Sequence, residues 1–308
     1  MPLYMGIDAG GTQTDCAIGN GAVLLGQATG ETCKVAQVPE ERARAALQDI
    51  ILRTCEAANV SPHEIEHVCI GISGASVPGN AAWAQSVIQE VVASKVRVMG
   101  DHVVAHRAAF GDCPGVLVIA GTGSIAYGTN ERNESARAGG WGPLVSDQGS
   151  AFWIGKEAVA AALREYDLGD KNGMIAAIAA SWKVSTPEEV LRIANSGLLA
   201  RFAELTPPVA QAAEQGHAAA QAIIQCAGKE LAELAGIVIA RLWPQGGVVR
   251  VAVSGGVLQG SSHVRQAFQQ ALRTVVPEAA ISFAYVRPVL GALAIAAAGV
   301  LPTREATP

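Results

Sequence analysis

The sequence has little positive charge, few aromatic residues and no long uninterrupted hydrophobic run. Its 308 residues include 22 lysines and arginines against 27 aspartates and glutamates, a formal net charge of −5, and only 5% aromatic residues. The basic residues are scattered, so the chain lacks the positive patch that nucleic-acid binding requires. The apolar stretch 286–301 is interrupted by Pro288, Gly291 and Gly299 and is too short to span a bilayer. We therefore expect no nucleic-acid partner and no membrane partner.

Cysteine is also sparse. The six cysteines are widely spaced and form no Cys-x-x-Cys pair, so they predict reduced thiols rather than a zinc or iron–sulfur site. The first apolar strand is predicted within a few residues of Met1, with no charged and apolar secretory leader before it. These features predict a cytoplasmic protein.

Apolar residues and glycine are abundant: 50% of the chain is hydrophobic and 34 residues are glycine. This composition is typical of an α/β protein. The chain is longer than a domain with a single hydrophobic core usually is, so we expect two lobes. The predicted boundary places residues 1–112 in an N-terminal lobe and 113–287 in a C-terminal lobe, with a hinge near 111–114. A final helix, about 288–308, is expected to pack back on the first lobe.

Two glycine-rich hairpins carry the first chemical signal. Residues 5–19 (MGIDAGGTQTDCAIG) and 117–128 (LVIAGTGSIAYG) each predict a strand, a tight turn and a second strand. Glycine lets phosphate oxygens approach backbone N–H groups, and the neighbouring hydroxyls add donors. Such turns are common and most bind nothing, but the pair favours phosphate binding. The expected phosphate-contacting residues are Gly10, Gly11, Thr12, Thr14, Thr122, Gly123 and Ser124.

Asp8 ends the first predicted strand, next to the first of these turns. A carboxylate there repels phosphate unless a hard cation lies between them, so Asp8 is a candidate for Mg²⁺ binding, directly or through water.

The order of predicted elements after the first hairpin repeats after the second, which suggests that one fold is duplicated. The second half is predicted to be more helical, with one long helical segment at 208–242. A strand is expected at 281–286.

Six glycine-rich or polar motifs are distributed over nearly the whole chain: GIDAGGTQTD, GISGAS, MGDHVVAH, AGTGSIAYG, GGWGPLVSDQGSAFWIG and AVSGGVLQGS. In this order they resemble the N-acetylglucosamine kinase branch of the BadF/BadG/BcrA/BcrD ATPase family, within the actin/hexokinase/Hsp70 superfamily. The resemblance implies a two-lobed actin-like ATPase fold with a duplicated ribonuclease H-like core and a central cleft. It also implies ATP as phosphoryl donor, Mg²⁺, and a homodimer.

Asp101 is the candidate catalytic base. Phosphoryl transfer to a sugar hydroxyl needs a carboxylate that orients the hydroxyl and accepts its proton, and the resemblance places Asp101 in that role. The alternative is structural, because an aspartate at the start of a helix is a favourable N-cap.

The segment 139–153 is the most distinctive, because it combines a glycine-rich backbone with tryptophan, aspartate and phenylalanine. Such a segment suits a sugar, although the tryptophan alternatively fills a lobe interface and Asp147 alternatively caps the next helix. The turn 254–256 follows a strand; the resemblance places it against adenosine, and the alternative is a plain turn. The expected nucleotide residues here are Ser254, Gly255 and Gly256. The expected sugar-contacting residues are Ser73, Gly74, Asp101, Gly140, Trp141, Asp147, Ala151 and Phe152.

One departure from the family pattern concerns the sugar. Where these kinases usually place an asparagine that binds sugar hydroxyls, this chain has Glu31-Thr32-Cys33-Lys34. A thiol at Cys33 cannot replace the paired donor and acceptor of an amide. Thr32 or Lys34 would have to assist, or the substrate differs.

The resemblance therefore implies an ATP-dependent amino-sugar kinase, with N-acetylglucosamine as the first expected acceptor and N-acetylglucosamine 6-phosphate as product. A glucosamine kinase of the same family is one alternative. An ATPase that activates a partner redox enzyme is another, although no glycine-flanked cysteine pair stands out. A sugar-sensing protein without catalysis is a third, disfavoured by the presence of both Asp8 and Asp101.

Overall fold

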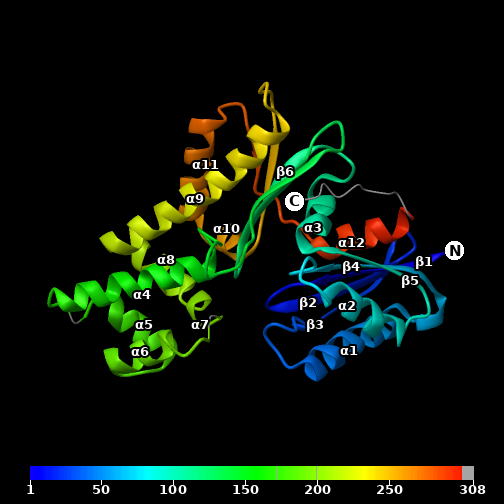
Figure 1. The fold of residues 1–308 in the computed structure, drawn as a ribbon, viewed down its shortest axis with the longest axis horizontal. Helices are drawn as coiled ribbons and strands as arrows, with labels where there is room; N and C mark the ends of the chain where they lie inside the picture. The colour runs from blue at the N-terminus through cyan, green and yellow to red at the C-terminus, as the bar shows by residue number, and fades with distance from the viewer. Residues whose placement is uncertain (171, 199, 300–308) are drawn as a thin grey trace. The chain divides into compact units, whose positions relative to one another are not determined.

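The chain divides into two compact units (Figure 1). Unit 1 comprises Met1–Pro114 together with the segment from Val286 onward, and unit 2 comprises Gly115–Tyr285. The computed structural model describes the following residues: 1–170, 172–198 and 200–299. The last part of the expected C-terminal helix, 300–308, lies outside the described residues.

Unit 1 is built on a five-stranded mixed sheet of order β3-β2-β1-β4-β5. Strands β1 and β2 are antiparallel, as are β2 and β3, whereas β1, β4 and β5 run parallel. The carboxyl ends of these three strands therefore meet at one edge of the sheet, where α/β proteins place their ligands. The strands are β1 (Leu3–Ala9), β2 (Gln13–Gly19), β3 (Leu24–Glu31), β4 (Ile65–Ile72) and β5 (Lys95–Gly100).

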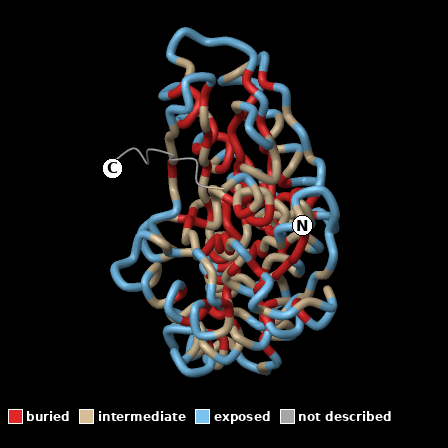
Figure 2. Tube along the Cα trace, turned by 90° about the vertical axis from the view of Figure 1, so that its right-hand side faces the viewer, coloured by how far each residue is buried: buried red, intermediate tan, exposed pale blue. Residues whose placement is uncertain are grey.

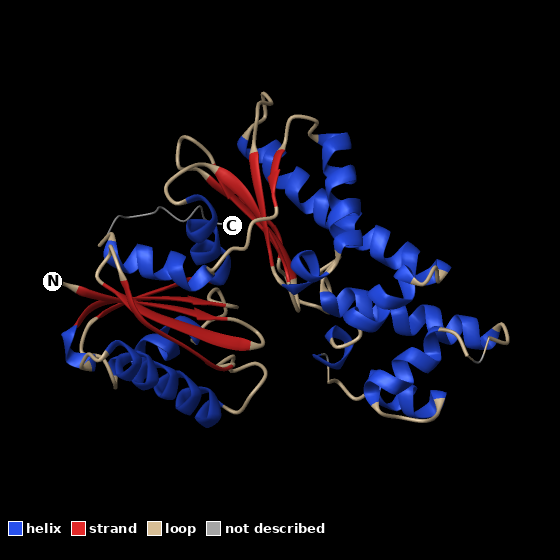
Figure 3. Ribbon diagram, turned by 180° about the vertical axis from the view of Figure 1, so that it is seen from behind, coloured by secondary structure: helices blue, strands red, loops and turns tan. Residues whose placement is uncertain are grey.

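Helices cover both faces of this sheet (Figure 3). On one face α1 and α2 enclose a core that includes Ile7, Leu47 and Ile88, all fully buried. On the other face α3 and α12 pack together over Cys69, Val104 and Ala292. The helical elements of unit 1 are α1 (Glu40–Ala58), the 3₁₀ turn η1 (Pro62–Glu64), α2 (Asn80–Gln89), α3 (Asp101–Phe110) and α12 (Pro288–Ala297).

Glycine permits the close approach of α12. A Cβ on Gly6 of β1 would lie 2.2 Å from the backbone nitrogen of Leu293, and one on Gly291 would lie 1.9 Å from the carbonyl oxygen of Val104. Neither position accepts a larger residue without moving backbone. The C-terminal helix is thus fitted to the sheet and to α3, and completes unit 1 although it follows unit 2 in the chain.

Unit 2 contains a second five-stranded sheet, of order β10-β9-β6-β7-β8. Read from β8 to β10, it has the same succession of antiparallel and parallel pairs as the first sheet. The duplication expected from the sequence is therefore present in the topology. The strands are β6 (Gly115–Ala120), β7 (Ser124–Thr129), β8 (Ser135–Gly139), β9 (Arg250–Ser254) and β10 (Ala280–Ser282).

The helices of unit 2 enclose its larger core, and Figure 2 shows the buried residues of the chain in red along the Cα trace. Helix α9 contacts β6, β7 and β8, and α11 packs on α9. These elements are α4 (Ala151–Asp167), α5 (Met174–Trp182), α6 (Pro187–Ala194), α7 (Ala200–Ala203), α8 (Thr206–Glu214), α9 (Ala218–Leu242), α10 (Gly256–Gly260) and α11 (Ser262–Val275). In the described part of the chain, no helix is both long and apolar enough to cross a membrane.

Two expected elements of unit 2 are corrected. The predicted continuous helical segment 208–242 is two helices, because Gly216 adopts a φ of 89° and His217 begins α9 by accepting a hydrogen bond from the Ala220 amide. The strand expected at 281–286 is only β10, because pairing with β9 ends at Ser282.

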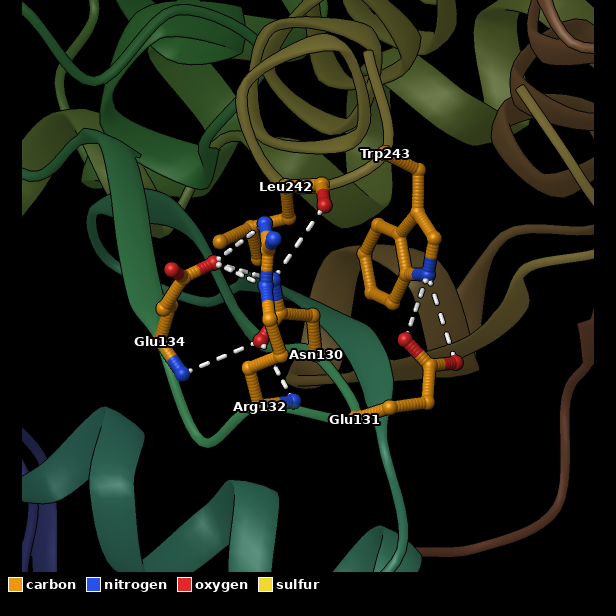
Figure 4. Close-up of polar contacts among 6 residues, drawn as sticks. All are labelled: Asn130, Glu131, Arg132, Glu134, Leu242 and Trp243. Atoms are coloured by element: carbon orange, nitrogen blue, oxygen red, sulfur yellow. Dashed lines mark hydrogen bonds and ion pairs between the residues drawn. The ribbon is translucent and has the colours of Figure 1, made fainter. Parts of the chain in front are cut away.

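A polar corner fixes the β7–β8 turn to the end of α9 (Figure 4). The buried Asn130 side chain donates to Glu134 Oε2 at 2.7 Å and to the carbonyl oxygen of Leu242 at 3.3 Å, and its own oxygen accepts from two turn amides. Beside it, Trp243 Nε1 donates to Glu131 at 3.1 Å. The turn is thereby tied to a helix more than a hundred residues later.

Candidate functional site

Three predicted site residues of unit 1 lie at one edge of its sheet. Ala9, Ile72 and Gly100 are register neighbours at the carboxyl ends of β1, β4 and β5. Asp8 immediately precedes the first of these residues, and Ser73 and Asp101 follow the other two. The sequence predicted each residue separately, and the parallel strands bring them to the same edge.

Asp8 is held in an environment that disfavours its charge. Burial, followed by the negative charges of Asp101 and Asp15, raises the pKa of Asp8 to about 7. Asp15 is its cross-strand neighbour on β2 and accepts from Thr29 at 2.5 Å and from Gln13 at 3.1 Å. Asp8, Asp15 and Asp101 thus form a set of three carboxylates, which are hard oxygen donors. Among the described residues, no basic side chain forms an ion pair with Asp8.

These carboxylates fit a magnesium ion better than a metal that is fully ligated by protein. Among the described residues, no three His, Cys, Asp or Glu side chains converge on one metal position. Mg²⁺ keeps several waters and is usually bound by one or two carboxylates plus substrate phosphates. Asp8 is suited to that partial role.

Asp101 is the first residue of α3 and does not cap it. The N-cap position belongs to Gly100, and no side chain accepts a capping hydrogen bond there. Asp101 Oδ1 instead accepts from the His102 amide at 2.9 Å and lies 3.5 Å from His102 Nδ1. About a third of the Asp101 side chain is exposed. The carboxylate is thus oriented by its neighbour and accessible.

The β1–β2 turn presents backbone and one hydroxyl to solvent. The Gly10 amide donates to the Gln13 carbonyl at 3.0 Å, and the Thr32 hydroxyl fixes the turn by donating to the Gly10 carbonyl at 2.9 Å. Gly11 is half-buried and Thr12 is exposed. The turn is therefore held in shape from behind, with its tip accessible.

Thr14 differs from expectation. Its side chain is fully buried, and its hydroxyl donates to Cys33 Sγ at 3.5 Å. Thr14 belongs to β2, which begins at Gln13, and its side chain faces the core, whereas Thr12 lies at the exposed tip of the turn before the strand. As placed, the hydroxyl binds a thiol inside unit 1 rather than presenting a donor to phosphate.

The β6–β7 turn of unit 2 is held by the beginning of α4. The amides of Ala151 and Phe152 donate to the carbonyl oxygens of Gly121 and Thr122 at 2.9 and 3.3 Å. Ser124, expected to face phosphate, is buried and donates to the Gln148 carbonyl at 2.7 Å. The Ser124 hydroxyl is therefore used in a structural hydrogen bond. Thr122 and Gly123 remain as the accessible part of the turn.

The segment that follows β8 is strained and partly exposed. Gly139, Gly140, Gly142, Asp147 and Gly149 all have positive φ, a conformation that glycine adopts freely and that aspartate adopts at a modest cost. Trp141 is 65% exposed, so it does not fill a core, and the Arg137 guanidinium lies 4.1 Å from its ring centroid. The ring is thus supported on one side.

Asp147 is buried, with only 5% exposure, and its carboxylate lies against Gly123. It does not cap α4: Ser150 does so, by accepting from the Trp153 amide at 3.2 Å. The structure therefore links the predicted sugar segment to the predicted phosphate turn within unit 2.

Ala151 and Phe152 also differ from expectation. Both side chains belong to the core of unit 2, and the Phe152 ring packs edge-on against Phe202 at a centroid distance of 5.3 Å. The sequence pattern did not distinguish a helix start that faces inward from one that faces a ligand. Their backbone amides act on the β6–β7 turn, and their side chains stabilise the core.

The turn after β9 lies beside the turn after β6. Ser254 pairs with Ile119, and Gly255, at φ 92°, would place a Cβ 2.4 Å from the carbonyl oxygen of Ala120. Gly256 opens α10 with nothing within 4 Å of its Cβ position. Unit 2 thus brings together the β6–β7 turn, the segment after β8 and this turn.

Sequence reasoning missed three contributors. Asp15 stands inside the first motif and adds charge beside Asp8; Thr32 was considered for the sugar alone; and Arg137 lies on β8, which was not predicted. The cross-strand register of β1 and β2 is the signal that identifies Asp15. The alternation of polar and apolar residues over 135–139 is the signal that identifies the strand of Arg137.

Comparison with known proteins agrees with this architecture. The BadF/BadG/BcrA/BcrD ATPase family matches residues 5–296. An N-acetylmuramic acid/N-acetylglucosamine kinase of Clostridium acetobutylicum is 30% identical over 91% of this chain and 94% of its own. An N-acetyl-D-glucosamine kinase of Dictyostelium discoideum is 27% identical over 78% of this chain and 80% of its own.

Solved structures share the fold at lower identity. A candidate N-acetylglucosamine kinase from Chromobacterium violaceum is 23% identical, covers 95% of this chain and 98% of its own, and gives a TM-score of 0.76. A ROK family glucokinase from Streptomyces griseus, in complex with glucose and AMPPNP, is 17% identical with a TM-score of 0.60, over 96% of this chain and 100% of its own.

Proposed function

The chain belongs to the BadF/BadG/BcrA/BcrD ATPase family, and we propose that it is an ATP-dependent kinase that phosphorylates an N-acetylated amino sugar. The observation that carries the proposal is the pair of carboxylates, Asp8 and Asp101, at the carboxyl edge of parallel strands in unit 1. Both curated relatives are amino-sugar kinases by name.

Asp101 acts as the base. Its carboxylate orients the acceptor hydroxyl and accepts the proton as that oxygen bonds to the γ-phosphorus and the bond to the ADP oxygen breaks. The hydrogen bond from the His102 amide keeps the carboxylate in one orientation. By resemblance the acceptor is the 6-hydroxyl, so the product is the sugar 6-phosphate.

Asp8 would hold Mg²⁺, directly or through water. A bound Mg²⁺ would neutralise phosphate charge in this reaction. The fit rests on the hard oxygen donors around Asp8 and on the cost of its charge when no cation is present.

The remaining roles are divided by unit. In unit 1 the amides of Gly10, Gly11 and Thr12 are proposed to contact phosphate, and Ser73 and Gly74 the sugar. In unit 2 Thr122 and Gly123 are proposed to contact phosphate. The other proposed contacts of unit 2 are Ser254, Gly255 and Gly256 with adenosine, and Gly140, Trp141 and Asp147 with the sugar. We give Thr14, Ser124, Ala151 and Phe152 supporting roles.

We further propose a homodimeric, cytoplasmic enzyme, with N-acetylglucosamine among its acceptors. The reducing compartment is supported by six cysteines that form no disulfide. N-acetylglucosamine occurs in the names of both curated relatives.

The test is sugar-stimulated ADP release from Mg·ATP, with N-acetylglucosamine, N-acetylmuramic acid, glucosamine and glucose as acceptors. Asp101→Asn should lower kcat by roughly 10²- to 10⁴-fold, because it loses the base and little else. Asp49→Asn, on the exposed face of α1, is the matched control and should leave kcat unchanged. The proposal fails if no sugar stimulates ADP release, or if Asp101→Asn keeps wild-type kcat.

A further inference from the structure

The turn after β3 is hydrogen-bonded to two other turns of unit 1, one proposed to contact phosphate and one proposed to contact the sugar. The Thr32 hydroxyl donates to the Gly10 carbonyl in the β1–β2 turn at 2.9 Å. The Lys34 ammonium donates to Ser73 Oγ, in the turn that follows β4, at 3.3 Å. Residues 32–34 therefore join a phosphate turn to a sugar contact, and we call these three residues the bridge.

The bridge is continuous because the Thr32 hydroxyl makes two hydrogen bonds. A hydroxyl has one proton to donate and lone pairs with which to accept. The proton of Thr32 goes to the Gly10 carbonyl, and the same oxygen accepts from the backbone amide of Lys34 at 3.2 Å. One oxygen atom thus links the β1–β2 turn to the backbone of Lys34, and the two bonds together fix its orientation.

Cys33 anchors the middle of the bridge in the core of unit 1. Its side chain is 3% exposed, and its Sγ accepts the hydrogen bond from Thr14 of β2 at 3.5 Å. Burial raises the pKa of the Cys33 thiol, so the thiol stays neutral. The residue that departs from the family pattern therefore does not face a sugar hydroxyl, and instead holds the bridge to the sheet.

The bond from Thr32 to Gly10 determines where the amide of Gly11 points. The Gly10 carbonyl and the Gly11 N–H belong to one trans peptide unit, whose planarity directs them to opposite sides. Because Thr32 holds the carbonyl on the side of the bridge, the Gly11 N–H is directed away from the bridge. This amide is one of the proposed phosphate donors. Thr32 is thus placed to orient a phosphate-binding group without touching the phosphate.

A further bond closes the network into a ring. The Ser73 amide donates to the carbonyl of Ala9, the residue before Gly10, at 3.3 Å, where β1 and β4 end side by side. Hydrogen bonds that share groups in this way support one another, and energetic coupling travels through such contiguous networks. A change in the position of Ser73 is therefore passed through Lys34 and Thr32 to the phosphate turn.

We propose that the bridge couples the two ligands of unit 1, so that a bound sugar raises the affinity for ATP, and ATP raises the affinity for the sugar by the same factor. The inference rests on the proposed function and assigns Thr32 and Lys34 as positioning residues for that reaction. A sugar that binds at Ser73 fixes the Lys34 side chain. Lys34 and Thr32 then hold the Gly11 amide in the direction that phosphate requires.

The experiment measures the dissociation constant of Mg·AMPPNP, a non-hydrolysable ATP analogue, with and without saturating N-acetylglucosamine. In wild type the sugar should lower this constant by about 5-fold or more, a usual coupling between sites. Thr32→Val keeps a branched side chain of similar shape and removes the hydroxyl. The coupling factor should then fall toward 1, a loss of about 2-fold to 10-fold, as expected for one hydrogen bond. Thr32→Ser retains a hydroxyl and should restore the factor.

Lys34→Met tests the other end of the bridge. It should lower the coupling factor as well, but leave the affinity for Mg·AMPPNP alone unchanged, because the Lys34 ammonium meets Ser73 and not the phosphate turn. Thr32→Val should weaken Mg·AMPPNP alone, because it frees the Gly10 carbonyl. The double variant should lose no more coupling than either single variant, since the bonds act in series and their effects are not additive.

Two matched variants distinguish coupling from a loss of stability. Thr274→Val removes a hydroxyl that donates to the Gln270 carbonyl on the exposed surface of α11, and Lys95→Met removes an exposed charge from β5. Both should keep the wild-type coupling factor. Thermal unfolding verifies that each variant is folded. A variant that is only less stable changes its Tm and not the ratio of the two dissociation constants.

The outcomes separate this inference from the proposed function. If N-acetylglucosamine stimulates ADP release but does not change the affinity for Mg·AMPPNP, or if Thr32→Val keeps the wild-type factor, the bridge does not couple the ligands and the kinase assignment stands. If no sugar stimulates ADP release, the proposed function itself fails, and the coupling role of the bridge fails with it.

Discussion

The carboxylate of Asp147 lies directly against Gly123: a Cβ on Gly123 would stand 2.7 Å from Asp147 Oδ2. Asp147 is buried and holds a φ of 64°, so it has little freedom to withdraw. The glycine between the two strands of the hairpin is therefore required by packing inside unit 2, in addition to any phosphate that approaches it.

Gly123→Ala should lower the free energy of unfolding by about 1–3 kcal/mol, the usual cost of forcing atoms into a filled site. It should also raise KM for ATP, because the β6–β7 turn must shift to admit the methyl group. Urea unfolding and ADP-release kinetics measure the two effects. Gly121→Ala, two residues earlier with nothing within 4 Å of its Cβ position, is the stability control and should unfold close to wild type. Equal stability of the two variants would contradict the packing role.

The sequence allowed the motifs to be found but not the direction in which each side chain points. Thr14 and Thr12 stand in the same glycine-rich turn motif, yet one hydroxyl is buried against Cys33 and the other is exposed. Alternation does not separate these two residues, because positions two apart on a strand face the same side; Thr12 is exposed because it lies in the turn, one residue before β2 begins at Gln13. The sequence does not show which residue ends the turn and begins the strand, so it does not distinguish the two hydroxyls.

Asp8 provides a pH-dependent test, because its pKa is raised to about 7 from a value near 3.8. Between these values the folded protein binds a proton that the unfolded chain does not, so the contribution of Asp8 to stability falls as pH rises from about 4 to 7. Asp8→Asn removes the free-energy cost of a charged carboxylate at this buried position. Without divalent cations it should exceed wild type in free energy of unfolding at pH 8, by up to about 4 kcal/mol, and match it near pH 4.

Magnesium should narrow this difference. At pH 8 the ion should stabilise wild type, in which the charged Asp8 is proposed to bind it, and should leave Asp8→Asn unaffected. Asp49→Asn, an exposed residue on α1, controls for the loss of one negative charge. Urea unfolding at both pH values, with EDTA and with Mg²⁺, gives the comparison; wild type and Asp8→Asn unfolding alike under all four conditions would argue against a strained charge at Asp8.

The two-lobed α/β fold was the most predictable part of the molecule, because hydrophobic runs and glycine-rich turns indicate the strands along the chain and the order of the motifs resembles that of a known family. The sugar-facing residues were the least predictable. Cys33 marked the place where the family pattern changes, but the partnership of Lys34 with Ser73 joins positions 39 residues apart. No local pattern encodes such a contact, since it arises only when β4 lies beside β1 in the folded sheet.

The polar corner at Asn130 should contribute to stability and not to catalysis (Figure 4). Asn130→Ala removes both amide donations and leaves the two turn amides of Arg132 and Glu134 without their acceptor, so the free energy of unfolding should fall by about 1–3 kcal/mol with kcat unchanged. Trp243→Phe removes one more exposed hydrogen bond in the same corner and should cost less.

The same corner predicts a pH dependence. The hydrogen bond from the Asn130 amide is the largest cause, and the charge of Arg132 a smaller one, of a lowered pKa for Glu134 in the folded protein. The stability that Glu134 contributes is therefore present above its pKa in the unfolded chain and is lost as the pH falls through its pKa in the folded protein. Urea unfolding should therefore show that the difference in unfolding free energy between wild type and Asn130→Ala narrows from pH 7 to pH 3. A difference that stays constant would mean that the hydrogen bonds of Asn130 to backbone groups alone carry the effect.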